Sequence, residues 1–132
     1  MENITVIRGK LYGEPVVLWG DGYQKRELVY IDDFVRIMLE LNEKYENDII
    51  NIGAGEERSI RDFAMQICRI VGFDFEKIHF DTSRYVGARS KVLSVKKLYS
   101  LLPELKMTPL EIGLEKTIDW LWKEQEKLDS LR

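Results

Sequence analysis

The sequence predicts an α/β fold in which short strands alternate with amphipathic helices. Short apolar runs rich in β-branched residues end in glycine turns, and the segments after them carry apolar residues at helical spacing. The length of 132 residues fits one domain, and 45% hydrophobic with 33% charged residues is typical of a globular chain. We therefore expect a single domain over residues 1–132.

The first predicted strand is Pro15–Trp19, a β-branched run that ends in a glycine turn. A second short strand is predicted over Glu27–Ile31. Asp32 or Asp33 then offers a side-chain oxygen that can cap a helix. A helix is predicted from Phe34 to about Tyr45, because these apolar residues share one face: Phe34, Ile37, Met38, Leu41 and Tyr45.

A third strand is predicted over Asp48–Ile52, where three isoleucines precede the turn Gly53-Ala54-Gly55. Ser59 and Asp62 have the spacing of a capping box, which indicates the start of another helix. Gly72 is a plausible carboxy-terminal cap for it. Its predicted buried face consists of Ile60, Phe63, Ala64, Ile67 and Val71.

The remaining elements are a strand, a loop and a short helix. Lys77–Phe80 is a fourth strand candidate, and Arg84–Ser90 has no apolar period and is interpreted as a loop. Ser94 is predicted to cap a short helix that carries leucines and that Pro103 stops.

The last predicted helix has the strongest start signal of the chain. Thr108 is placed at the N-cap, Pro109 at the first helical position and Glu111 at the third. We expect this helix to run to about Lys127. Its predicted buried stripe consists of Leu110, Leu114, Ile118 and Leu121.

Composition excludes several classes of function. Twenty basic and twenty-three acidic side chains give a net charge of −3, which argues against nucleic acid as the main partner. No apolar stretch approaches the roughly 18 residues of a membrane span. A single cysteine cannot form an internal disulfide, and no secretory signal is visible, so we expect a cytoplasmic protein.

The residues that could carry catalysis or bind a metal have structural interpretations. Cys68 and His79 are the only cysteine and histidine, so they cannot build a zinc site alone. Cys68 is expected to be a core thiol, and His79 has no positioned partner in the sequence. Gly53-Ala54-Gly55 is interpreted as a tight turn, because Arg58 stands where a dinucleotide fingerprint has its third glycine.

Two aromatic and two basic residues surround the first glycine turn: Trp19, Tyr23, Lys25 and Arg26. This set suits a ligand with a planar ring and phosphates, and the guanidinium of Arg26 can bind phosphate oxygens through two donors. A solvated turn with a packed tryptophan explains the same residues. A second basic cluster lies in the predicted loop and consists of Arg84, Arg89 and Lys91.

Four segments in this order resemble the carboxy-terminal part of NAD-dependent epimerases and dehydratases: Val16–Asp33, Asn51–Ala64, Ile78–Ser94 and Thr108–Leu121. These are extended short-chain dehydrogenases that act on nucleotide sugars, and the GDP-fucose synthases have one of the most similar patterns. The resemblance implies a small α/β substrate-binding domain that lacks the amino-terminal Rossmann cofactor domain.

The resemblance also implies which residues bind the nucleotide sugar. Trp19 corresponds to the tryptophan beside the nucleotide, and Arg26 to the arginine that contacts the diphosphate. Arg89 and Lys91 are implied phosphate or sugar contacts, and Arg8 matches a basic residue that faces the substrate from the end of a helix.

The family's catalytic and cofactor motifs are absent from this sequence. It has no GxxGxxG turn, and no tyrosine is followed four residues later by lysine. We therefore expect no catalytic residue and no cofactor in this chain, although NAD(P) is implied for a full-length relative. Val86 stands where GDP-fucose synthases have an acidic residue, which argues against GDP-fucose synthase activity itself.

Expected partners follow from the same resemblance. They are a nucleotide-diphosphate sugar, bound weakly at most, and either the missing Rossmann domain or a second copy of the chain. Neither nucleic acid nor a membrane is expected. The alternative hypothesis is a free-standing interaction or regulatory module that retains the fold without chemistry.

Overall fold

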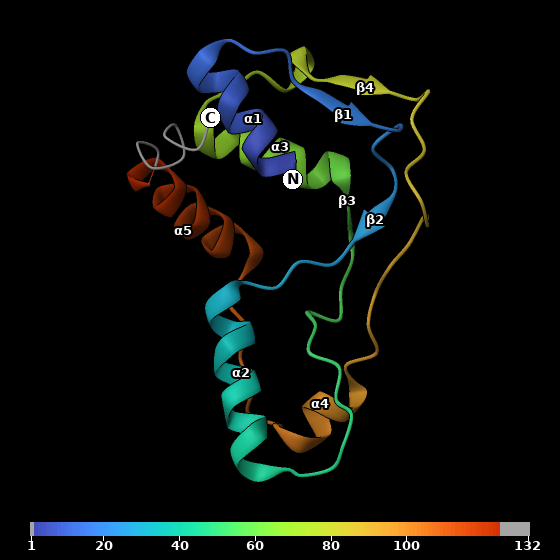
Figure 1. Ribbon diagram of the computed structural model, residues 1–132, viewed down its shortest axis with the longest axis vertical. Helices are drawn as coiled ribbons and strands as arrows, with labels where there is room; N and C mark the ends of the chain where they lie inside the picture. Colours follow the sequence, from blue (N-terminus) through green and yellow to red (C-terminus); the bar gives the residue numbers. More distant parts are fainter. Residues whose placement is uncertain (1, 125–132) are drawn as a thin grey trace.

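The computed structural model describes residues 2–124, with side chains from residue 5 onward. Helices and short strands follow each other along the chain, which confirms the predicted α/β class (Figure 1). In order, the elements are α1 (Glu2–Tyr12), β1 (Val17–Trp19), β2 (Lys25–Arg26), α2 (Ile31–Lys44), β3 (Arg58–Ser59), α3 (Ile60–Val71), the 3-10 helix η1 (Phe75–Lys77), β4 (His79–Asp81), α4 (Lys96–Leu101) and α5 (Leu110–Lys123).

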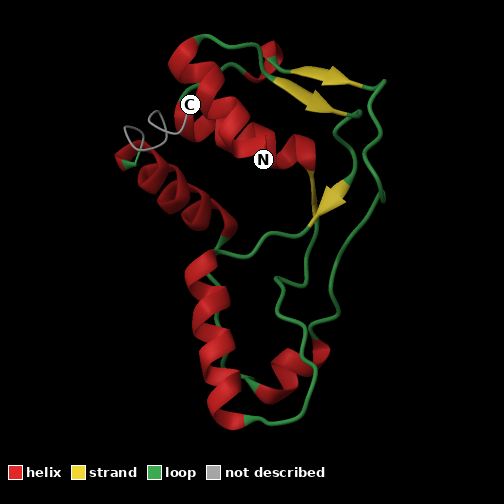
Figure 2. Cartoon of the chain, in the orientation of Figure 1, coloured by secondary structure: helices red, strands yellow, loops and turns green. Residues whose placement is uncertain are grey.

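The described chain forms two lobes (Figure 1). The larger lobe contains α1, β1, α3, β4 and α5, and the smaller lobe contains α2 and α4. Long extended segments run between them (Figure 2). Each lobe has its own hydrophobic core, so neither core depends on a continuous sheet through the molecule.

The larger lobe is built on a two-stranded parallel sheet. Strand β1 pairs with β4 so that Val17 lies opposite His79 and Trp19 opposite Asp81. The side chain of Leu18 is buried in the core, while the side chains of Val17 and Trp19 are exposed on the other face of the strand. This alternation is expected because successive side chains of a strand point to opposite faces. The strand predictions for 15–19 and 77–80 are therefore confirmed for the existence of both strands, but each strand begins two residues later than predicted, and Lys77 lies in η1. Helices α1, α3 and α5 supply the rest of this core.

Helix α3 begins with the predicted capping box. The Ser59 hydroxyl accepts a hydrogen bond from the Asp62 backbone N–H at 3.1 Å, and the Asp62 carboxylate accepts one from the Ser59 N–H at 3.0 Å. Gly72 ends the helix in the left-handed conformation with a φ of 67°. The predicted buried face is also confirmed, since all of its members are buried: Ile60, Phe63, Ala64, Ile67 and Val71.

The smaller lobe has a core of four buried residues, Ile37 and Leu41 from α2 with Leu98 and Leu102 around α4. Helix α2 confirms the predicted helix of that region, but its apolar surface is wider than predicted, and Phe34 and Met38 of the predicted face are exposed. Its exposed apolar residues form a patch that we call the α2 face: Ile31, Phe34, Val35, Met38 and Leu39. An apolar face of this extent is typical of a surface that another structure covers.

Two strand predictions are wrong. Residues 27–30 run as an extended connection into α2, which already begins at Ile31, and residues 48–52 form a loop. A strand needs a neighbour for its backbone N–H and C=O groups, and no described strand lies beside either segment. At 48–52 the lysine side chain of Lys97 hydrogen-bonds to Asp48 and to the Ile49 carbonyl instead.

Three predicted N-caps are also wrong. The capping positions are occupied by Tyr30 in α2, Val95 in α4 and Pro109 in α5, and none makes a side-chain cap hydrogen bond. Consequently Asp32, Asp33, Ser94 and Thr108 do not cap their helices. Asp33 points elsewhere, because its carboxylate accepts a hydrogen bond from the Thr108 backbone N–H at 2.6 Å.

The last two sequence predictions concern a loop and the end of the chain. Residues 84–90 form no helix or strand, which confirms the predicted loop. Helix α5 is described to Lys123, and its buried residues Leu114 and Ile118 confirm the predicted stripe. The predicted extension to Lys127 lies outside the described residues.

Candidate functional site

A pocket of about 380 Å³ opens where the carboxyl end of β1 meets β2, the start of α3 and the loop after β4. Residues from α1 to the loop at 85–86 contribute to it, although they lie far apart in the sequence. The lining residues are Thr5, Val17, Leu18, Trp19, Gln24, Arg26, Ile60, Tyr85 and Val86.

Trp19 supplies an aromatic surface at the mouth of this pocket. It ends β1, and 59% of it is exposed. The guanidinium carbon of Arg84 lies 5.6 Å from the centre of the indole ring, which is within range of a cation–π contact. The ring therefore presents a flat apolar surface with a positive charge beside it, an arrangement that suits a planar ligand group near an anion.

Arg26 supplies the positive charge in the pocket, and its side chain also holds the neighbouring loop. Its Nη1 donates hydrogen bonds to the carbonyls of Lys25 at 2.6 Å and Ala88 at 2.9 Å, and its Nη2 donates to the carbonyl of Val86 at 3.1 Å. Phosphate oxygens are stronger acceptors for a guanidinium than carbonyls are. An anion at this position would therefore compete with the loop for Arg26.

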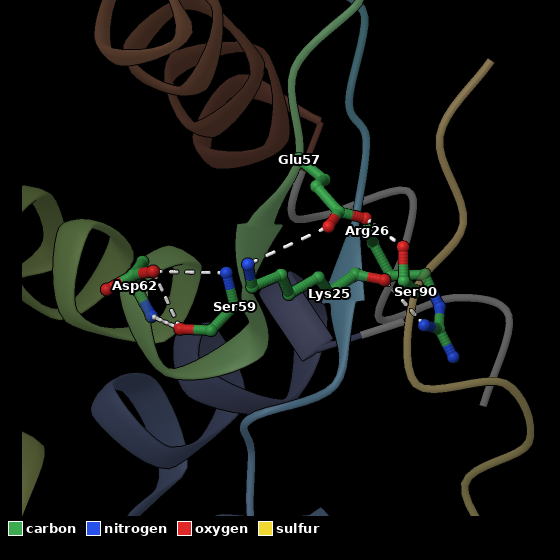
Figure 3. Close-up of polar contacts among 6 residues, drawn as sticks. All are labelled: Lys25, Arg26, Glu57, Ser59, Asp62 and Ser90. Atoms are coloured by element: carbon green, nitrogen blue, oxygen red, sulfur yellow. Dashed lines mark hydrogen bonds and ion pairs between the residues drawn. The ribbon is translucent and has the colours of Figure 1, made fainter.

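The loop at 84–91 has further attachments to β2 and β3. The backbone N–H of Lys25 donates to the carbonyl of Arg89 at 2.7 Å, and the Ser90 hydroxyl donates to the carboxylate of Glu57. Lys25 also forms an ion pair with Glu57, with 3.7 Å between nitrogen and oxygen. Figure 3 shows Lys25, Arg26, Glu57 and Ser90 together around β2. These contacts attach the loop at 84–91 to β2 and to the residue before β3.

The other predicted site residues do not line the pocket. Arg89 and Lys91 are exposed on the same loop, beyond Val86. Arg8, on α1, makes a double hydrogen bond to the carboxylate of Glu14 at 2.7 and 2.8 Å. The structure thus brings Trp19 and Arg26 together and leaves the three other cations outside this cavity.

Gln24 is a pocket residue that the sequence did not reveal. It is only 7% exposed, and its Nε2 donates a hydrogen bond to the carbonyl of Trp19 at 3.0 Å. Its Oε1 is buried and has no hydrogen-bond partner in the described part of the chain. A glutamine within a polar turn gives no sequence sign of burial, so only the proximity to Trp19 and Arg26 could have suggested it.

Asp81 places a negative charge close to Trp19, its cross-strand neighbour. Hydrogen bonds from the hydroxyl and backbone N–H of Ser83 hold the pKa of Asp81 below its usual value, and Arg84 adds to this effect. The negative charge of Asp81 is thus stabilised by Ser83 and Arg84, which follow it in the same turn. A negatively charged ligand in the pocket faces a paired carboxylate at this point.

Cys68 and His79 lie away from the pocket lining. Cys68 is buried in α3, and burial, with a smaller effect of Asp74, raises the pKa of its thiol to about 11, so the thiol is protonated at neutral pH. His79 is exposed on β4. Over residues 2–124, no three His, Cys, Asp or Glu side chains are grouped as a metal site, and no helix is long and apolar enough to cross a bilayer.

Comparison with known proteins gives consistent matches. Residues 3–53 match the NAD dependent epimerase/dehydratase family. The chain is 35% identical to a dTDP-4-dehydro-6-deoxy-D-allose reductase of a Streptomyces species over 82% of its length, and 35% identical to GDP-L-fucose synthase 1 of Arabidopsis thaliana over 83%. The crystal structure of a GDP-L-fucose synthetase from Naegleria fowleri bound to NADP covers 95% of the chain with a TM-score of 0.87 and 26% identity.

These matches involve only part of each relative. The chain spans 32% and 34% of the two curated relatives and 40% of the Naegleria fowleri chain. The family model, the sequence relatives and the fold agree with the resemblance that the motifs at Val16–Asp33 and Asn51–Ala64 predicted. The predicted resemblance to the NAD dependent epimerase/dehydratase family is therefore confirmed.

Proposed function

We propose that this chain is the carboxy-terminal, substrate-binding portion of a nucleotide-sugar epimerase, dehydratase or reductase. The observation that carries the proposal is that Trp19 and Arg26 line the same pocket. An indole surface can hold a nucleobase or ribose by stacking, and a guanidinium can hold the diphosphate. The names of the relatives, a dTDP-sugar reductase and GDP-fucose synthases, support this ligand class.

The remaining cations take secondary positions in this proposal. Arg89 and Lys91 lie on the loop that Arg26 holds, so they reach a sugar or phosphate only outside the cavity. Arg8 reaches a ligand only if it leaves the carboxylate of Glu14. We therefore assign the principal contacts to Trp19 and Arg26 and peripheral contacts to the other three.

The described residues do not fit the nicotinamide dinucleotide that the family name implies. The turn that most resembles a phosphate-binding loop, Gly53-Ala54-Gly55, is occupied by the carboxylate of Glu27. Its Oε1 accepts the Gly55 N–H at 2.6 Å and lies 2.5 Å from where a Cβ of Gly53 would be. A carboxylate in this place repels phosphate and uses the N–H that would bind it.

The chemistry of the complete enzyme therefore belongs to a part that this sequence does not contain. We expect no binding of NAD(P) and no turnover by the chain alone. The α2 face is the natural surface for the missing Rossmann domain, and a second copy of the chain can cover it in isolation. The same face suits the alternative function, an interaction module. We also propose a cytoplasmic location.

The proposal is tested by titrating the labelled chain with UDP, GDP and NAD(P) and following chemical shifts. We expect the nucleoside diphosphates to bind at roughly millimolar concentration, about 4 kcal/mol, with shifts around Trp19 and Arg26. Arg26→Ala should weaken binding about fivefold, because it removes a charge-assisted contact. Arg69→Ala, an exposed arginine of α3 outside the pocket, is the matched control and should change nothing.

Two results would contradict this function. Shifts confined to residues far from Trp19, or equal in the Arg26→Ala variant, would remove these two residues from the ligand site. Micromolar binding of NAD(P) would show that the chain holds the cofactor. Absence of all nucleotide binding would favour the interaction module instead.

A further inference from the structure

The amide of Gln24 has an unusual environment in the candidate pocket. Gln24 is only 7% exposed, it lines the cavity, and its Oε1 has no hydrogen-bond partner among residues 5–124. Buried polar atoms in native proteins are nearly always paired, so an unpaired acceptor in a ligand pocket needs an explanation. A hydrogen-bond donor on the ligand would provide one.

The Nε2 group fixes which end of the amide can meet a ligand. It donates to the carbonyl of Trp19 at 3.0 Å. Rotating the amide by half a turn would place two oxygens against each other, so this bond holds Oε1 as an acceptor. The pocket therefore holds an acceptor of fixed orientation in the same lining as Trp19, whose ring we assign to a planar group of the ligand.

Val86 and the Gln24 amide both lie beside Gly20. The position of a Cβ on Gly20 would lie 2.5 Å from Cγ1 of Val86 and 3.5 Å from both amide atoms of Gln24. The valine methyl, the glycine and the amide thus meet at one point. Val86 is kept there by Arg26, whose Nη2 donates to the Val86 carbonyl at 3.1 Å. A diphosphate that draws Arg26 away from this carbonyl would free the Val86 side chain, which lies near Gly20 as the Gln24 amide does.

We propose that Gln24 selects the base of the nucleotide, accepting at Oε1 a hydrogen bond from the ring N–H of a keto base such as uracil, thymine or guanine. This inference rests on the proposed function and specifies its substrate class. Cytosine and adenine carry a ring acceptor at the corresponding position, so they would set two acceptors against each other. Binding of the diphosphate at Arg26 and reading of the base at Gln24 are coupled through Val86.

The experiment compares UDP and GDP with CDP and ADP on the full chain by chemical-shift titration. We expect the keto nucleotides to bind about three- to tenfold more tightly, the range of one hydrogen bond. UDP methylated at N3 keeps the ring and the phosphates but lacks the donor, and it should bind like CDP. In Gln24→Met, which keeps the size of the side chain without its amide, all of these ligands should bind equally.

A matched control is available in α3. Gln66 also has a buried Oε1 that no described residue hydrogen-bonds, and its Nε2 donates to Glu111 at 3.3 Å, but it lies outside this pocket. Gln66→Met should therefore keep the preference for keto nucleotides. If Gln24→Met does not fold, the comparison of UDP with its N3-methyl derivative on the wild-type chain decides the question alone.

The outcomes separate this inference from the proposed function. Equal binding of UDP, N3-methyl-UDP and CDP, still weakened by Arg26→Ala, would overturn the role of Gln24 and leave the nucleotide site intact. If no nucleotide binds, both proposals fail. A preference that survives Gln24→Met would also overturn the assignment to this residue.

Discussion

At the scale of single residues, Arg26 of β2 and the next residue, Glu27, form hydrogen bonds with three other segments of the chain. Arg26 holds the carbonyls of Val86 and Ala88, while the carboxylate of Glu27 accepts the backbone N–H groups of Gly55 at 2.6 Å and Leu93 at 2.9 Å. An arginine and a glutamate here fix chain segments that are distant in sequence. Arg26, which the sequence predicts as a ligand contact, thus also stabilises the position of a loop.

The buried carboxylate of Asp33 leads to a prediction about stability. It accepts hydrogen bonds from the Thr108 backbone N–H at 2.6 Å and from Arg36 at 3.0 Å. Burial by itself raises the pKa of Asp33, but these hydrogen bonds outweigh it and hold the pKa below the ordinary 3.8. Asp33→Asn should lower the free energy of unfolding by about 1–2 kcal/mol at pH 7, measured by urea denaturation.

The pH dependence of this effect has a definite sign. Since the folded-state pKa is below the unfolded value of 3.8, the contribution of Asp33 is complete above that pH and is lost as the pH falls through the folded pKa. The difference between wild type and Asp33→Asn should therefore shrink in acid. Glu43→Gln, an exposed carboxylate of α2, is the control. A difference that stays constant from pH 7 to pH 2 would contradict this assignment.

At the scale of elements, α3 is the helix whose sequence signals and structure agree at both ends. Its capping box and its terminal glycine both occupy the predicted positions. Helices α2, α4 and α5 begin without side-chain caps, so tertiary contacts must hold their first turns. Capping substitutions should therefore affect α3 more than the others.

This comparison can be tested with two serines. Ser59→Ala removes the acceptor of the Asp62 N–H and should destabilise the chain by about 1 kcal/mol in thermal or urea unfolding. Ser94→Ala is the matched control, because Ser94 has the predicted cap spacing but α4 begins after Val95 without a side-chain cap. Its cost should be below about 0.5 kcal/mol. Equal losses in both variants would argue against the structural distinction between the two helix starts.

At the scale of the whole molecule, the two lobes touch through few elements. The side chain of Tyr30 lies against Gly113 of α5, where a Cβ would approach it to 3.2 Å, and Lys116 lies 5.3 Å from the centre of the same ring. Asp33 and Arg36 bind the segment at 106–108 from the other side. The smaller lobe is thus attached at the start of α2, and the α2 face remains uncovered.

The uncovered α2 face predicts self-association of the isolated chain. Met38 is 46% exposed there, within a stripe of apolar residues. Met38→Glu should shift the chain toward monomer in sedimentation velocity across a concentration series, because burying the new charge in a contact is costly. Ile112→Glu is the matched control: Ile112 is 45% exposed but lies on α5, outside the α2 face. A wild-type chain that stays a compact monomer at every concentration would contradict the prediction.

The sequence by itself determined the α/β class, β1, β4, α2, α3, α4, α5 and the loop at 84–90. These elements are specified by local signals, namely apolar periodicity, a capping box and glycine turns, which act over a few residues. It also predicted the resemblance to the family, and with it the candidate ligand contacts Trp19 and Arg26, because motif order is a property of the sequence alone.

Tertiary structure decided the rest. Residues 27–31 and 48–52 have strand composition, yet they lack a strand neighbour, and backbone pairing depends on segments distant in sequence. For the same reason Asp33 and Thr108 bind each other across 75 positions and do not cap their own helices. Gln24 lines the pocket because the fold buries its amide beside Gly20, and no local pattern records which polar side chain the tertiary structure will bury.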